Sequence, residues 1–290
     1  MKQIKYLLLS ITFIFLSIFI TGCTTDDMNN INIYVTNYAN EYVTKSLYGN
    51  HSTIKSIYPD GVDITTYKIT DKQKKDYARS DLFIYNGLIE KERDLAVDLL
   101  SINPDLRIID SAYVLETDYS PEELWLNPSS LLMMSQNIRL GLEEYITSTY
   151  LKKDADEAYE TLKVTFSELD ADYRLTTENT NKKTIVVDNS ALMYLEKFGL
   201  TVYCLDGDVS NKTLDLVEKA MDKKEISYIY NFKNETLSDN ANALMKKYSN
   251  VKNLSIHRLD NISDTERAEN DDYISLTNDN LELLKKELYQ

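Results

Sequence analysis

The sequence predicts an α/β protein of two similar lobes, each with a mostly parallel four-stranded sheet, joined by a long rigid helix. Short β-branched or aromatic runs alternate with amphipathic helical stretches, a rhythm typical of βα units and parallel sheets. The alternation occurs twice, once in each half of the chain. Between the halves, the stretch from Asp154 to about Thr177 contains neither Gly nor Pro. Each half is therefore expected to form one lobe, and the stretch between them a single helix.

The first half, residues 31–150, offers four strands separated by helical stretches. The strand candidates are Ile31 to Thr36, Thr53 to Tyr58, Asp81 to Tyr85 and Leu106 to Asp110. Helical periodicity falls between them at Tyr38 to Tyr48, Asp71 to Arg79 and Glu90 to Ser101. Since parallel strands need long crossover connections, this order predicts a parallel sheet.

The middle of the chain is expected to be helical. The run Asn127-Pro128-Ser129-Ser130 opens a helix, because proline is allowed in a first turn, and this helix is expected to reach about Tyr150. A second helix is expected from Asp154 to about Thr177, roughly 36 Å long at 1.5 Å per residue. Flexible connectors are rich in Gly and Ser, so the segment 151–182 is predicted to be a rod that links the lobes.

The second half, residues 183–290, repeats the rhythm of the first. Its strand candidates are Thr184 to Asp188, Leu200 to Leu205, Ile226 to Tyr230 and Asn253 to Leu259. Its helical stretches are Ser190 to Phe198, Lys212 to Lys224, Asp239 to Tyr248 and Asp271 to Tyr289. A second parallel four-stranded sheet is therefore expected.

The N-terminus has the pattern of a secretory signal. Lys2 and Lys5 precede an uncharged apolar run that is shorter than the about 20 residues of a membrane span. Small residues follow, and then Cys23, which resembles the lipid-modified cysteine of bacterial lipoproteins. This predicts a signal peptide over residues 1–22, a lipidated tether over residues 23–30, and a protein anchored to the extracytoplasmic face of the cell membrane. The alternative is an ordinary signal peptide or anchor with an incidental cysteine.

Composition excludes several functions. The formal net charge of −15 argues against nucleic acid as a partner, because phosphates require a basic surface. After Cys23 only Cys204 remains, so no internal disulfide is expected, and its apolar surroundings predict a core position. The chain has two histidines and none of the common hydrolase, metalloprotease or nucleotide-binding motifs. We therefore expect no enzyme activity.

A ligand site is expected where the two lobes face each other. In open α/β sheets ligands bind beyond the carboxyl ends of the strands, and clefts between domains are common binding sites. Four polar loops follow predicted strands: Asp60 to Tyr67, Glu116 to Asn127, Asn189 with Ser190, and Asp260 to Ser263. These loops would converge on one cleft.

The segment Pro59 to Tyr67, followed by Ala78 to Leu88, resembles the metal-binding solute receptors of zinc and manganese ABC importers. In that family the first segment typically reads Pro-x-Gly-x-Asp-Pro-His-x-Tyr, and the second is a strand that ends in Asn-Gly, here Asn86-Gly87. Further matches are Leu124 to Pro128, Tyr194 to Leu200, Leu259-Asp260, Asp272-Tyr273-Ile274 and Asn280-Leu281. The resemblance covers the chain beyond its N-terminal signal. It implies a lipid-anchored receptor that binds a metal ion or small solute between its lobes and docks on an ABC permease.

The resemblance also implies a ligand set, but the usual residues are replaced. The family generally holds its metal with three histidines and one carboxylate, one from each of the four loops. The histidine positions fall on Thr65, Glu123 and Asn189, and the carboxylate position on Asp260, with Glu122 as an alternative to Glu123. All three histidines are therefore absent.

This oxygen-rich set changes the expected ligand. Imidazole suits zinc, whereas carboxylate and carbonyl oxygens suit magnesium, calcium and manganese. A divalent cation such as manganese is therefore favoured over zinc. His51 is predicted to be a solvated loop residue away from the cleft, and His257 a strand residue whose polar atoms are satisfied within the fold.

Two other interpretations remain open. The receptor fold could have lost metal binding and act through protein contacts, as an adhesin or an accessory factor. It could also bind an organic solute in the same cleft, with Tyr67, Trp125 and Tyr194 as an apolar wall.

Overall fold

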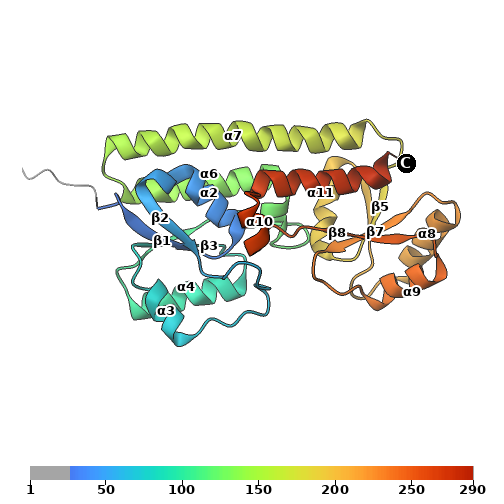
Figure 1. Ribbon diagram of the computed structural model, residues 1–290, viewed down its shortest axis with the longest axis horizontal. Coiled ribbons are helices and arrows are strands. Elements are labelled where there is room, and N and C mark those ends of the chain that lie inside the picture. The colour runs from blue at the N-terminus through green and yellow to red at the C-terminus, as the bar shows by residue number, and fades with distance from the viewer. Residues whose placement is uncertain (1–26, 290) are drawn as a thin grey trace, which may run out of the picture.

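The computed structural model describes residues 27–289. The predicted signal peptide and Cys23 lie outside the described residues. Two α/β lobes lie side by side, and two long helices, α7 (Thr149–Glu178) and α11 (Tyr273–Leu288), run along the same side of the molecule (Figure 1). No helix among residues 27–289 has the length and apolar character needed to cross a membrane.

The N-terminal lobe contains a four-stranded parallel sheet in the order β2-β1-β3-β4. Its strands are β1 (Ile31–Val35), β2 (Ser52–Ser56), β3 (Leu82–Tyr85) and β4 (Arg107–Asp110). Helices α3 (Asp71–Tyr77) and α4 (Glu90–Ile102) cover one face, and α2 (Tyr38–Tyr48) and α6 (Pro128–Tyr145) cover the other (Figure 1). Each predicted strand of this half is present, with ends shifted by at most two residues.

The C-terminal lobe has an equivalent parallel sheet in the order β6-β5-β7-β8. Its strands are β5 (Thr184–Val187), β6 (Thr201–Cys204), β7 (Tyr228–Phe232) and β8 (Lys252–Ile256). Its crossovers are the 3-10 helix η2 (Ser190–Phe198) and helices α8 (Asn211–Asp222) and α9 (Asp239–Lys247). The two sheets share one strand order, which confirms the predicted fold of two similar lobes.

The helices between the lobes differ from the prediction in where they break. Helix α6 ends at Tyr145, and α7 begins at Thr149 rather than near Asp154. The Ser148 hydroxyl accepts a hydrogen bond from the Leu151 backbone N–H, so Ser148 is the cap that starts α7. At 30 residues, α7 is longer than expected and packs against α2 and α6 of the first lobe and η2 and α11 of the second.

One hydrophobic core runs through both lobes. It includes Val35 and Trp125 of the first lobe, Phe166 of α7, and Val187 and Tyr273 of the C-terminal half. Smaller cores lie under α3 and α4 and under α8 and α9, on the opposite faces of the sheets. The lobes are thus joined by shared packing as well as by chain connections.

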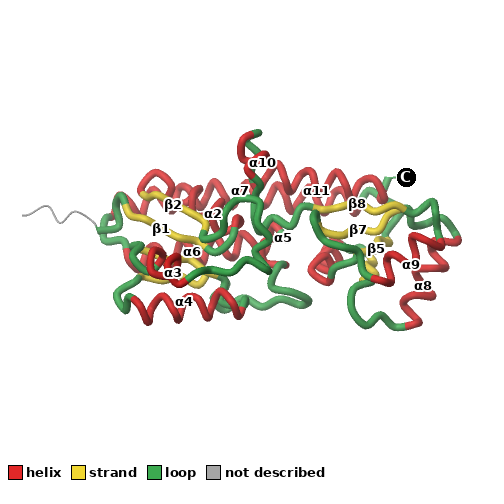
Figure 2. Tube along the Cα trace, turned by 60° about the horizontal axis from the view of Figure 1, so that its bottom comes forward, coloured by secondary structure: helices red, strands yellow, loops and turns green. Residues whose placement is uncertain are grey.

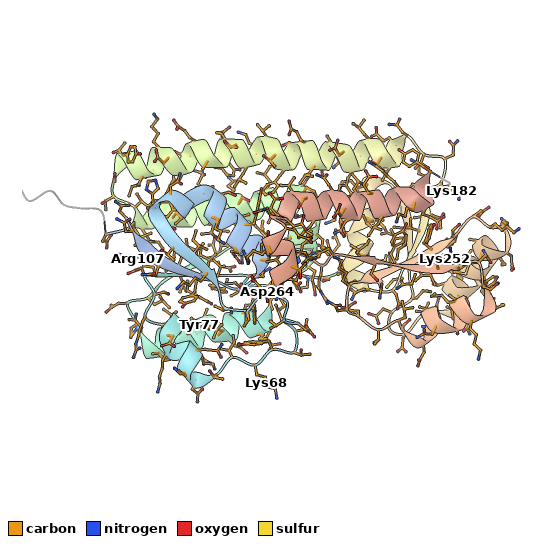
Figure 3. All side chains as sticks on the ribbon, in the orientation of Figure 1. Lys68, Tyr77, Arg107, Lys182, Lys252 and Asp264 are labelled. Atoms are coloured by element: carbon orange, nitrogen blue, oxygen red, sulfur yellow. The ribbon has the colours of Figure 1, made fainter. Side chains whose placement is uncertain are left out.

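Three short helices were not expected from the sequence. These are η1 (Gly49–His51), α5 (Glu123–Leu126) and α10 (Asp264–Ala268). Figure 2 shows α5 and α10 between the two lobes. In Figure 3, Asp264 at the start of α10 lies near the middle of the molecule, while Arg107 and Lys182 lie toward opposite ends. These two helices therefore border the region where the lobes meet.

Candidate functional site

A polar cavity of about 390 Å³ lies where the lobes meet. It is lined by residues 61–63 and 65 after β2, residues 233–235 after β7, and residues 257, 258 and 260–263 with Glu266 after β8. All of these segments follow the carboxyl ends of parallel strands, as expected for a ligand site in this kind of sheet. A neighbouring cavity of about 330 Å³ includes Glu122 and Trp125 in its wall.

Thr65 and Asp260 are the two predicted site residues that line both cavities. Thr65 is exposed, and its hydroxyl donates to the Asp63 carboxylate at 2.6 Å. Asp260 is partly buried, and its backbone carbonyl accepts the Tyr38 N–H at 2.8 Å. Burial raises the pKa of the Asp260 carboxyl to about 6, although the nearby Arg258 guanidinium acts in the opposite direction.

Glu123 and Glu122 have different surroundings. Glu123 is fully buried, and its carboxylate accepts backbone N–H groups of Tyr119 and Ser120 and pairs with Lys197 Nζ at 3.0 Å. Glu123 thus stabilises the loop that precedes α5, and it lines neither cavity. Glu122 lines the smaller cavity, with Oε1 at 3.3 Å from Arg258 Nη2. Of the two candidates on this loop, the structure therefore brings Glu122 to the cavities.

Asn189 contacts the site through a second residue. Its side-chain oxygen accepts the Ala191 N–H at 2.9 Å and so caps η2. Its Nδ2 donates to Glu235 Oε2 at 3.1 Å. Glu235 lines the larger cavity, whereas Asn189 does not.

Glu235 and Arg258 also line the larger cavity, although the sequence did not predict them there. The Arg258 guanidinium pairs with Glu235 through Nη1 and with Glu122 through Nη2, and its Nε lies 3.5 Å from Asp260 Oδ2. Burial opposes the charge of this group, but the three carboxylates raise the pKa of Arg258 above its ordinary value. The available signal in the sequence was that Arg258 stands two residues before Asp260.

The two histidines do not occupy the places expected for them. Strand β8 ends at Ile256, so His257 starts the following loop and lines the larger cavity. Its Nδ1 accepts the Leu259 N–H at 3.0 Å, and its Nε2 lies 3.4 Å from Glu266. His51 is not solvated, because its Nε2 lies 3.0 Å from the Asp154 carboxylate of α7 and its side chain is only 13% exposed.

The segment after β8 is bonded tightly to the N-terminal lobe. The Gly61 N–H donates to the Ile262 carbonyl at 2.8 Å, and Asn261 Nδ2 donates to the Val62 carbonyl at 2.7 Å. Arg267 pairs with both oxygens of Asp60, at 2.5 and 2.8 Å. Asp260 is therefore held against the N-terminal lobe, although it follows the last strand of the C-terminal sheet.

The site has the negative charge that a bound cation requires, but a cationic side chain, Arg258, already lies among its carboxylates. Glu122, Glu235 and Asp260 surround the Arg258 guanidinium. Within residues 27–289, no three or more His, Cys, Asp or Glu side chains are arranged to hold a metal ion. A ligand that binds between these carboxylates must therefore compete with Arg258.

Two α/β lobes that share a long helix and enclose a polar cavity at their strand ends define a two-lobed solute-binding protein. Residues 33–287 match the ZnuA family, described as zinc-uptake complex component A, periplasmic. The chain belongs to this family.

Comparison with individual proteins agrees with that membership. The chain is 22% identical to the zinc-binding lipoprotein AdcA of Streptococcus pneumoniae, over 99% of this chain and 61% of AdcA. The Zn(II)-bound ZnuA-like domain of AdcA superposes with a TM-score of 0.73 at 21% identity, covering 90% of this chain and 100% of that domain. The laminin-binding protein Lbp of Streptococcus pyogenes superposes with a TM-score of 0.72 at 20% identity, covering 90% and 99% of the two chains. The chain thus spans less than two thirds of the length of AdcA.

Proposed function

We propose that this chain is the solute receptor of a metal-type ABC importer, held by Cys23 at the extracytoplasmic face of the membrane. The observation that carries the proposal is the cavity between the lobes, where carboxylates from both lobes converge. Membership of the ZnuA family supports it. In this role the receptor binds its solute between the lobes and delivers it to a membrane permease.

The solute that fits this site is a divalent cation that prefers oxygen ligands, such as manganese. Glu122, Glu235 and Asp260 supply carboxylates, and Thr65 supplies a hydroxyl. The imidazole of His257 is engaged at both nitrogens, so the site does not offer the ligand that zinc prefers. Zinc, which AdcA is named for binding, is therefore the less favoured ion here.

Calorimetry and native mass spectrometry test this proposal. Full-length protein in detergent is titrated with manganese, zinc, calcium and magnesium up to millimolar concentration. We expect one site per chain that prefers manganese to zinc, and at least about tenfold weaker binding in Glu235→Gln and Asp260→Asn. Glu41→Gln is the matched control, because Glu41 is a buried acid outside the two cavities. The absence of binding to all four ions would overturn the metal part of the proposal.

A second candidate is a surface lipoprotein that keeps the receptor fold and acts through protein contacts. The pairing of three carboxylates with Arg258 favours it, because the site already contains a cationic side chain without a metal. The similarity to a laminin-binding protein points in the same direction. Cross-linking in native membranes separates the two candidates: an importer receptor is recovered with a permease, and an adhesin is not.

A further inference from the structure

We infer that Arg258 is the resident cation of the site, bridging the two lobes without metal and setting the affinity for any divalent ion that enters. This inference rests on the proposed function and concerns the same cavity. It assigns Arg258 as a specificity-determining residue, since an incoming ion must displace its guanidinium.

The first support is the position of the guanidinium. Its Nη1 pairs with Glu235, its Nη2 lies 3.3 Å from Glu122, and its Nε lies 3.5 Å from Asp260. Glu235 belongs to the C-terminal lobe, Glu122 belongs to the N-terminal lobe, and Asp260 is bonded to the N-terminal lobe through Tyr38. One side chain therefore contacts acids from both sides of the cavity.

The second support is that the fold holds Arg258 in this place. The Arg258 side chain is 19% exposed, and its guanidinium carbon lies 4.8 Å from the centre of the Phe232 ring. Its backbone carbonyl accepts a hydrogen bond from Trp125 Nε1 at 3.0 Å. The residue is thus fixed at its backbone by one lobe and stacked on a strand of the other.

The third support is that the pairing leaves Arg258 displaceable. Its Nε is buried without a hydrogen-bond partner, because the contact with Asp260 lacks hydrogen-bond geometry. Arg258 also lines the 390 Å³ cavity, which offers space into which its side chain can move. A divalent ion and a guanidinium repel each other at a few ångströms, so the guanidinium beside these carboxylates weakens the binding of an ion there. Metal binding is therefore expected to move the Arg258 side chain away.

The test compares Arg258 with a matched arginine in full-length protein in detergent. Arg258→Gln removes the charge but keeps a hydrogen-bonding side chain. Arg139→Gln removes an arginine of similar exposure, 17%, that pairs with Glu143 and Asp156 and lies outside the two cavities. Manganese calorimetry should show at least about tenfold tighter binding for Arg258→Gln than for the unaltered protein, and no change for Arg139→Gln. Equal or weaker binding by a folded Arg258→Gln protein would overturn the competition.

Hydrogen exchange without metal gives a second, independent readout. With EDTA present, residues 118–123 and 233–238 should exchange faster in Arg258→Gln than in the unaltered protein, and at the unaltered rate in Arg139→Gln. Unchanged exchange in Arg258→Gln would overturn the bridge. If no protein binds any ion, the proposed metal receptor fails and the competition fails with it, while the exchange rates still decide whether Arg258 bridges the lobes.

Discussion

The indole Nε1 of Trp125 donates a hydrogen bond to the backbone carbonyl of Arg258 at 3.0 Å. Trp125 is 1% exposed, and its own carbonyl accepts the Tyr273 hydroxyl at 2.5 Å. This pair of bonds joins the loop after β4 to the segment after β8 and to α11. The single tryptophan therefore connects both lobes next to the candidate site.

The variant Trp125→Phe should lower the free energy of unfolding by about 2 kcal/mol. It keeps an aromatic ring but leaves the Arg258 carbonyl without its donor. Urea unfolding followed by circular dichroism measures the change. Tyr289→Phe is the control, because it also removes an aromatic donor to a carbonyl, that of Thr176, but at a residue that is 51% exposed. Equal losses in the two variants would contradict the structural role of Trp125.

Glu92 should make stability fall as the pH rises from about 4.5 to 7. Burial raises the pKa of this carboxyl from 4.5 to about 7, against hydrogen bonds from Thr36 and the Asn86 N–H that act to lower it. The folded protein therefore binds this proton more tightly than the unfolded chain. The stabilisation is complete below pH 4.5 and is lost as the pH passes the folded pKa, by about 3 kcal/mol in total.

The measurement is urea unfolding at several values between pH 4.5 and 7.5. Glu92→Gln cannot titrate, and its amide oxygen can still accept from the Asn86 N–H and the Thr36 hydroxyl. The difference between the unaltered protein and the variant should therefore change over this range. Parallel curves would show that Glu92 has no raised pKa in the fold.

Gly141 of α6 should not tolerate a side chain. A Cβ there would lie 2.7 Å from the Ile109 side chain of β4, which is buried. Gly141→Ala should therefore destabilise by about 1 to 3 kcal/mol through overpacking, less what alanine gains in helix propensity. Gly49→Ala is the control, because the nearest atom to its added Cβ is 3.9 Å away. Calorimetric melting of both variants tests the difference.

The sheets were predictable because each strand is a short β-branched or aromatic run followed by a helical period. The ends of the helices were less predictable. The Ser148 hydroxyl caps α7, so this helix starts at Thr149, several residues before the predicted Asp154. The glycine of the Asn86-Gly87 match is explained by local packing. A Cβ at Gly87 would lie 2.1 Å from the Asp110 carboxylate, so a larger residue does not fit there.

The direction of loop side chains was not predictable. Leu259 adopts a φ of 63°, a left-handed conformation that is uncommon for a branched residue, and it lies between Arg258 and Asp260. The spacing of apolar residues along the sequence does not predict a left-handed backbone conformation at a single loop residue. The loops were therefore found from the sequence, but the guanidinium at their centre was not.

Glu122 and Glu123, which are neighbours on one loop, should separate ligand binding from stability. Glu123→Gln should destabilise by about 1 to 3 kcal/mol, because a buried carboxylate that accepts backbone N–H groups and pairs with Lys197 loses its charge. Its manganese affinity should stay unchanged, since Glu123 lines neither cavity. Glu122→Gln should do the reverse: the manganese affinity falls because the site loses one carboxylate, while the free energy of unfolding shifts little at this partly exposed residue. Urea unfolding and manganese calorimetry on both variants provide the comparison. Loss of binding in Glu123→Gln with stability intact would return the ligand role to Glu123, the family's own position.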